Sequence, residues 1–116
     1  MILRQLTDEI SIKPLNMVLK GTLESLASNS QGTILTLSAT QDCYISRISC
    51  SGDSYAMYQL YLDTNLIETK KVGQYSTDFI FPVPLLIESG KILDVKVTHF
   101  YNGKTYDFDS SIFYRV

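Results

Sequence analysis

Hydrophobic and polar residues alternate in short stretches along most of this chain. Alternation of period two is typical of strands that bury one face. Turn-forming residues separate the stretches, and the spacing of roughly ten residues is that of an antiparallel sandwich or barrel. We therefore predict an all-β, antiparallel, jelly-roll-like sandwich of about seven or eight strands. The strands expected before the last 25 residues are Thr33 to Leu37, Tyr44 to Cys50, Tyr55 to Leu62, Leu66 to Val72, Ser76 to Phe81 and Leu85 to Ile87.

Two further alternating stretches, Ile92 to Phe100 and Thr105 to Tyr114, flank Asn102-Gly103. Asn-Gly is a strong hairpin signal because both residues accept the positive φ angles of a tight turn. One register sorts the side chains into an apolar and a polar face, which is the test that a correct register should pass. We therefore expect these stretches to pair directly, with Val97 opposite Phe108 and Lys96 opposite Asp109.

The segment Phe81-Pro82-Val83-Pro84 contains two prolines. A proline has no N–H to donate to a neighbouring strand, so this segment cannot lie in the middle of a sheet. It predicts an edge strand or a crossing between sheets.

The first 30 residues lack a single period and precede a polar hinge, so we divide the chain into an N-terminal arm or edge segment, 1–30, and a sandwich domain, 31–116. Two interpretations remain open: the segment adds a strand to its own sandwich, or it is an arm that buries its apolar residues on a neighbouring subunit. The candidate subunit-contact residues are Ile2, Leu3, Leu6, Ile10, Ile12, Leu15, Met17 and Leu19.

Composition removes several classes of partner. The chain has 116 residues, a net charge of −2 and basic residues that are mostly isolated, so we expect no nucleic-acid partner. No apolar run approaches the ~20 residues of a membrane span, and no signal sequence is recognisable, so we expect neither a membrane nor a secreted protein.

Catalytic and metal-binding chemistry is poorly represented. The single histidine, His99, is expected to be structural, and one histidine with two distant cysteines does not make a zinc site. Cys43 and Cys50 are expected to end on opposite faces of one strand, about 23 Å apart, so they should not form a disulfide with each other. We expect no metal, no cofactor and no enzymatic activity, and retain one hydrolase or weak cation-site hypothesis on the predicted polar face of the hairpin, at Asp94, Asp107 and Asp109.

The features from Asp42 to Tyr114 also occur in a familiar order. The Ile45 and Ile48 strand, Tyr61-Leu62-Asp63, the segment from Phe79 to Pro84, Leu86-Ile87-Glu88-Ser89-Gly90, and the stretches Leu93 to His99 and Asp107-Phe108 resemble small β-sandwich structural proteins of tailed bacteriophage virions. The resemblance implies a non-enzymatic building block in many copies, made in the host cytoplasm and located in the virion. Its partners would be other copies of itself, as a homo-oligomer or part of a large assembly, and other virion proteins in head decoration, neck, tail or baseplate.

An alternative from a different class is a carbohydrate-binding module for host or glycan attachment. The chain has eight tyrosines and no tryptophan. Tyrosine rings stack on sugars, but they also complete sandwich faces and subunit contacts. The candidate exposed surface consists of Tyr55, Tyr61 and Tyr75.

Overall fold

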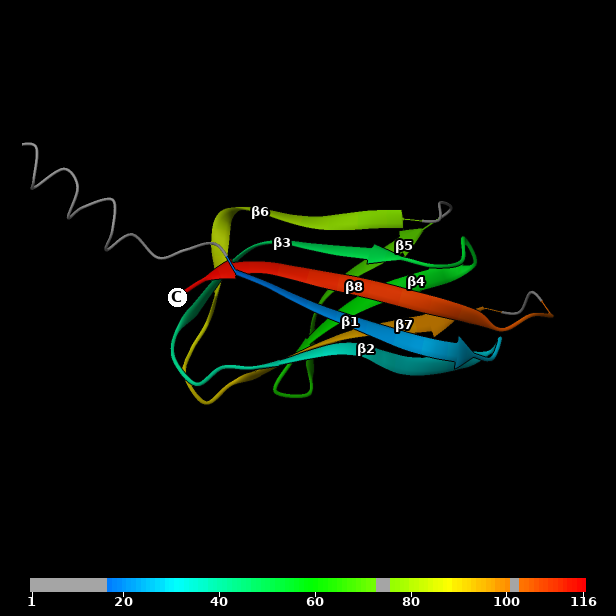
Figure 1. Ribbon diagram of the computed structural model, residues 1–116, viewed down its shortest axis with the longest axis horizontal. Coiled ribbons are helices and arrows are strands. Elements are labelled where there is room, and N and C mark those ends of the chain that lie inside the picture. The colour runs from blue at the N-terminus through cyan, green and yellow to red at the C-terminus, as the bar shows by residue number, and fades with distance from the viewer. Residues whose placement is uncertain (1–16, 73–75, 101–102) are drawn as a thin grey trace, which may run out of the picture.

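The computed structural model describes residues 17–72, 76–100 and 103–116, with the backbone alone at 71 and 72, and its secondary structure there is entirely β (Figure 1). Within these residues no helix is long and apolar enough to cross a membrane. The strands are β1 Met17–Leu26, β2 Ser30–Ser38, β3 Cys43–Ser51, β4 Ala56–Leu62, β5 Asn65–Val72, β6 Ser76–Ile87, β7 Ile92–His99 and β8 Tyr106–Arg115.

The strands form two four-stranded antiparallel sheets. Sheet A has the order β1-β8-β3-β6 and sheet B the order β2-β7-β4-β5. Figure 1 shows sheet A in front of sheet B, with successive strands of the chain often placed in different sheets. This arrangement is a jelly roll, which confirms the predicted fold class.

The predicted C-terminal hairpin is wrong, because β7 and β8 belong to different sheets. Val97 is opposite Gly32 and Tyr58, and Phe108 is opposite Leu23. Both side chains are nevertheless fully buried, since each strand turns its apolar face into the space between the sheets. The alternation of hydrophobic and polar residues predicted correctly which face of β7 and of β8 is buried. It could not predict which strands pair with them.

The core contains the inward side chains of both sheets, among them Tyr58, Leu60 and Phe108. Cys43 and Cys50 are both buried and free, as expected for a chain without a disulfide between them, but they do not lie on opposite faces. A register shift between Ile45 and Arg47 reverses the alternation, so that both thiols point inward. Burial raises the pKa of the Cys50 thiol to about 12.

The proline segment lies in β6, an edge strand of sheet A, which confirms the edge-strand alternative. Ser46 alone separates Ile45 from Arg47 in β3, whereas residues 81–84 separate the partners of those two residues in β6. The extra residues leave the ladder as a bulge, and Val83 at its centre is 83% exposed. The chain reaches sheet B only after Ile87.

Residues 17–26 of the N-terminal segment form β1, the edge strand that pairs with β8. This part therefore follows the first interpretation, a strand added to its own sandwich. The predicted polar hinge, Ser28 to Gly32, is a turn only in part. Ser28 and Asn29 lie in the turn between β1 and β2, where Asn29 has a φ of 61°, whereas Ser30 to Gly32 begin β2. The role of residues 1–16 as an arm stays a prediction, because they lie outside the described residues.

Candidate subunit interface

The single histidine is a buried structural residue. His99 Nδ1 lies 3.1 Å from the carbonyl oxygen of Leu26, and Nε2 lies 2.8 Å from Asp53 Oδ2. A carbonyl oxygen only accepts hydrogen bonds, so Nδ1 donates to Leu26, while Nε2 is hydrogen-bonded to Asp53. The ring also packs edge-on against Tyr106 and Phe108, with centroids 5.8 and 5.2 Å away.

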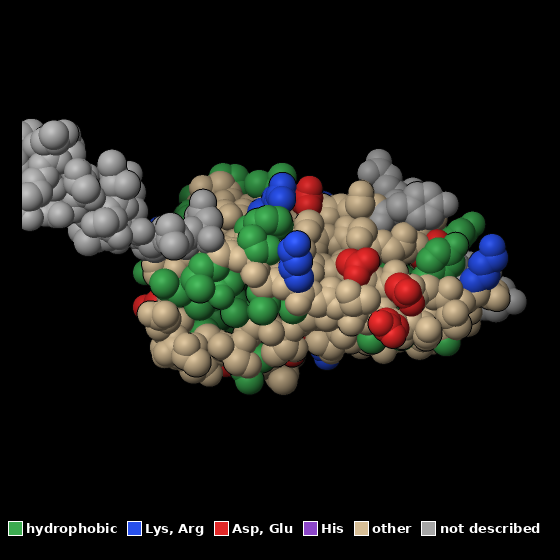
Figure 2. Space-filling model, in the orientation of Figure 1, with side chains coloured by type: hydrophobic (Ala, Val, Ile, Leu, Met, Phe, Trp, Pro, Cys, Tyr) green, Lys and Arg blue, Asp and Glu red, His purple; other side chains and the backbone are tan. Residues whose placement is uncertain are grey.

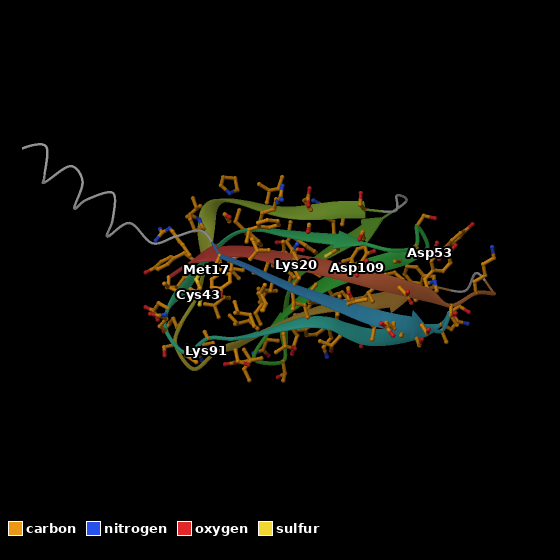
Figure 3. All side chains as sticks on the ribbon, in the orientation of Figure 1. Met17, Lys20, Cys43, Asp53, Lys91 and Asp109 are labelled. Atoms are coloured by element: carbon orange, nitrogen blue, oxygen red, sulfur yellow. The ribbon has the colours of Figure 1, made fainter. Side chains whose placement is uncertain are left out.

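These contacts explain why His99 is present and why it is a poor candidate for catalysis. The ring has no solvent exposure, and Asp53 is 3% exposed. The pair joins the end of β1, the β3–β4 loop and the end of β7, at the end of the molecule opposite Met17 (Figure 3). A general base must reach a substrate proton, and this ring is enclosed by protein.

The three aspartates proposed as a hydrolase or cation site do not come together. Asp94 lies on sheet B, whereas Asp107 and Asp109 lie on sheet A. Each carboxylate also accepts a hydrogen bond from an adjacent strand or turn. Asp94 accepts from the Thr36 hydroxyl, Asp107 from the Ser25 backbone N–H and Asp109 from the Thr22 hydroxyl. Within the part of the chain that the structure describes, no cluster of three or more metal-ligating side chains exists. The predicted common face depended on the hairpin that did not form.

The candidate tyrosine surface is also dispersed. Tyr55 precedes β4 and is 56% exposed, while Tyr61 lies near the far end of β4, half-buried under Lys96 with the ammonium 4.8 Å from the ring centroid. Six residues of strand place these two tyrosines about 20 Å apart, too far for one sugar ring to stack on both. Tyr75 lies outside the described residues.

The outer face of sheet A carries exposed apolar side chains on neighbouring strands. Register partners place Val18, Phe113, Arg47 and Ile80 in one row across all four strands, and Arg115, Tyr44 and Leu86 in the adjacent row. Val18, Ile80 and Leu86 are 46, 66 and 41% exposed. We call these two rows the sheet A patch: Val18, Tyr44, Arg47, Ile80, Leu86, Phe113 and Arg115.

The rest of the same face is polar. The rows that follow along the strands contain Lys20, Ser111, Ser49 and Asp78, and then Thr22, Asp109, Ser51 and Ser76. Figure 2 shows the hydrophobic side chains gathered toward the end of the face where β1 begins, with acidic side chains mainly over the other half. The apolar side chains are therefore a local patch rather than a general property of the sheet.

Two arginines give the patch a positive charge and a rigid aromatic base. The Arg47 guanidinium lies 4.2 Å from the Phe113 ring centroid, and that of Arg115 lies 4.5 Å from the Tyr44 centroid. Such cation–π contacts hold the arginine stems flat on the surface while their N–H groups stay available to a partner. A groove of about 250 Å³ opens beside them, lined by Ser46, Arg47, Phe113 and Tyr114.

Of the residues predicted from sequence to contact another subunit, two lie in the structure. Met17 is 41% exposed at the start of β1, next to Val18, and Leu19 is partly buried against the core. Ile2, Leu3, Leu6, Ile10, Ile12 and Leu15 lie outside the described residues. Their proposed contact with a subunit stays a prediction.

Sequence reasoning missed the sheet A patch, although a signal was present. Phe79-Ile80-Phe81 and Ile112-Phe113-Tyr114 are apolar at every position. In a two-sheet sandwich alternate residues face outward, so such a run must expose an apolar side chain unless something covers it.

No family model and no curated protein matches the sequence. Solved structures with a similar fold include the capsid of Helicobacter pylori bacteriophage KHP30, with a TM-score of 0.60, 10% identity and 90% coverage of each chain. The capsid asymmetric unit of cyanophage Pam1 matches with a TM-score of 0.58 and 10% identity, over 90% of this chain and 87% of that chain. Bacillus endospore appendages, described as disulfide-linked pili, match with a TM-score of 0.52 and 16% identity, over 90 and 91%. At these identities the likeness shows the fold, which phage capsid proteins share.

Proposed function

We propose that this protein is a non-enzymatic structural subunit of a phage particle that acts through contacts with copies of itself and with other virion proteins. Its position would be head decoration or a neck, tail or baseplate part. The observation that carries the proposal is the sheet A patch, which crosses every strand of one sheet on a jelly roll of the kind found in phage capsids.

The patch supports assembly because burying exposed apolar surface against a partner stabilises the contact. The stabilisation is roughly 25 cal/mol per Å² of apolar surface removed from water. A single exposed aliphatic residue needs no explanation, but two adjacent rows in register form a continuous surface. Arginine and aromatic residues are also the types enriched at protein–protein interfaces. The internal location of His99 and the separation of the aspartates leave the described residues without an obvious catalytic alternative.

The full chain should therefore associate in solution. Sedimentation velocity over a wide range of concentration, with electron microscopy of the largest species, is the test. We expect regular oligomers or particles whose fraction rises with concentration, because copies are the proposed partners. A glycan array with the same preparation provides the counter-test. A chain that stays monomeric at every concentration and binds a defined glycan would replace this proposal with the carbohydrate-binding alternative.

A further inference from the structure

The two edge strands of sheet A carry complementary side chains in the same outward rows. In the first row of the sheet A patch, Val18 on β1 and Ile80 on β6 are both aliphatic. In the polar row next to it, Lys20 on β1 and Asp78 on β6 have opposite charges. The edges therefore match each other, apolar with apolar in one row and cation with anion in the other.

Lys20 and Asp78 cannot pair within one subunit. The strands β8 and β3 lie between β1 and β6, so the backbones of the two residues are about 14 Å apart. An ion pair requires charged atoms within about 4 Å of each other, and side chains on a strand stand away from the sheet instead of lying across it. Lys20 is exposed on the face that Figure 3 shows, and Asp78 is half-buried. Both charges are therefore directed toward whatever covers this face.

We propose that the outer face of sheet A packs on the same face of a second copy, about a two-fold axis that runs parallel to the strands between β8 and β3. The inference rests on the proposed assembly function and specifies one of its contacts. The axis places β1 of each copy over β6 of the other. Val18 then packs on Ile80 of the partner subunit. In the next row Lys20 faces Asp78 of the partner subunit, once on each side of the axis.

The same axis brings each arginine of the patch to an aromatic ring. Arg47 on β3 is beside Phe113 on β8, whereas in the adjacent row Arg115 is on β8 and Tyr44 is on β3. The axis exchanges β8 and β3, so each guanidinium lies over a ring of the partner subunit and not over another arginine. Arginine stacks favourably on aromatic faces, so this exchange extends the cation–π contacts already present within one subunit.

A two-fold axis across the strands fits the face less well. At the centre of the face it would lay the Val18 row on the Lys20 row and bury charges against aliphatic side chains, which is costly. Moved into the patch, it would cover only the two apolar rows. The parallel axis covers these two rows and the two polar rows that follow, and the two copies together would bury roughly 1,000 Å². This area is typical of a weak specific interface, so the dimer should dissociate on dilution.

Charge reversal in full-length chains tests the pairing. Lys20→Glu alone would place two carboxylates together on each side of the axis, and Asp78→Lys alone would place two ammonium groups there. Each change should lower the association constant about tenfold or more. An equimolar mixture of the two variants restores opposite charges at both places, so heterodimers should form about as tightly as the parent dimer. Sedimentation equilibrium measures the association, and tags of different mass identify the heterodimer.

Glu68→Lys is the matched control for Asp78→Lys. Glu68 is exposed on β5 of sheet B, and the substitution makes the same change in net charge. It should leave the association constant unchanged and, mixed with Lys20→Glu, should give no rescue. A general effect of net charge on association would instead move Glu68→Lys and Asp78→Lys alike.

Thiol cross-linking with both charges in place measures the direction of the axis. One chain carries Val18→Cys and a second, with a tag of different mass, carries Ile80→Cys. A bismaleimide that spans the about 10 Å between packed sheets should join them, whereas Cys43 and Cys50 are buried and should not react. The control replaces Ile80→Cys by Leu66→Cys, which is 54% exposed on sheet B. Its yield should be about tenfold lower, as for a contact without specific affinity.

The outcomes separate this contact from the proposed function. Single variants that associate like the parent, a mixture that fails to restore association, or equal cross-linking with Ile80→Cys and Leu66→Cys would each overturn the two-fold contact. Regular oligomers of the parent chain would in those cases leave the assembly function standing with another surface. A parent chain that stays monomeric at every concentration would remove both. Thermal melting identifies a misfolded charge variant, in which case the cross-linking decides.

Discussion

Gly21 in β1 lies close against the backbone of β2 in the other sheet, and Gly21→Ala tests how tight that contact is. A Cβ at this position would lie 2.6 Å from the Ile34 carbonyl oxygen and 2.9 Å from Leu35 Cδ1. The carbonyl oxygen is backbone in β2, so it cannot rotate away. One of the two edge strands must shift to admit the methyl group.

The expected cost follows from two opposing terms. Overpacking of a filled site costs about 1–3 kcal/mol. Replacing glycine by alanine also restricts the unfolded chain, which stabilises the fold by about 0.4–1 kcal/mol. Gly21→Ala should therefore lower the free energy of unfolding by roughly 1–2 kcal/mol.

Gly32→Ala is the matched control, because Gly32 lies on the neighbouring strand and faces side-chain tips. Its Cβ would lie 2.5 Å from Leu23 Cδ2 and 3.3 Å from Leu26 Cδ1. A leucine that leaves its preferred rotamer costs about 0.5–1.5 kcal/mol, which the unfolded-state term largely offsets. We expect a change within about 0.5 kcal/mol in urea unfolding followed by circular dichroism. Equal stabilities of the wild type and Gly21→Ala, or a larger loss for Gly32→Ala, would refute the reasoning about the β1–β2 corner.

Three further predictions concern single side chains. The hydroxyl of Tyr58 is buried with no hydrogen-bond partner among the described residues, so Tyr58→Phe should raise the free energy of unfolding by about 1 kcal/mol, and a loss in the same urea assay would mean that the hydroxyl has a partner. Because burial raises the pKa of both Cys43 and Cys50, a thiol reagent should label either thiol only at the rate at which the protein unfolds and exposes it. Rapid labelling of either thiol in the native protein would contradict their burial. The Ile92 backbone N–H and the Lys91 ammonium, 2.8 and 3.3 Å from Asp63, hold the pKa of that carboxyl below its ordinary value of 3.8. The ionised form is thus favoured by folding, so its contribution is present above pH 3.8 and is lost as the pH falls through the lower, folded pKa. Urea unfolding of wild type and Asp63→Asn should accordingly differ above that value and converge in stronger acid, and a constant difference would refute the pairing.

The sequence predicted the fold class and the positions of β2 to β5, β7 and β8, because alternation depends only on local residues. It left β1 open and gave β6 as two separate strands. It failed where the answer depended on which strands meet. Val97 and Phe108 point inward whether they are neighbours in one sheet or lie in facing sheets, so a clean two-face register was no evidence for a hairpin. The same limitation produced the supposed cluster of Asp94, Asp107 and Asp109.

Local irregularities were the second source of error. The register shift next to Ser46 turned Cys43 and Cys50 to the same side, and no residue in that stretch signals a bulge. The sheet A patch needed both kinds of information. Phe113 and Arg47 meet only because β8 inserts beside β3, a pairing between residues far apart in the chain.

The position of β8 has a consequence for how the protein is made. It follows the other strands that the structure describes, yet it occupies the interior of sheet A between β1 and β3. Until β8 has been synthesised, β1 has no ladder partner in sheet A and β3 has only β6. Contacts between distant strands form slowly, and their unpaired edges invite association with other chains. Sheet A should therefore close only after synthesis of β8, so nascent chains in crowded polysomes should depend on chaperones until that strand inserts.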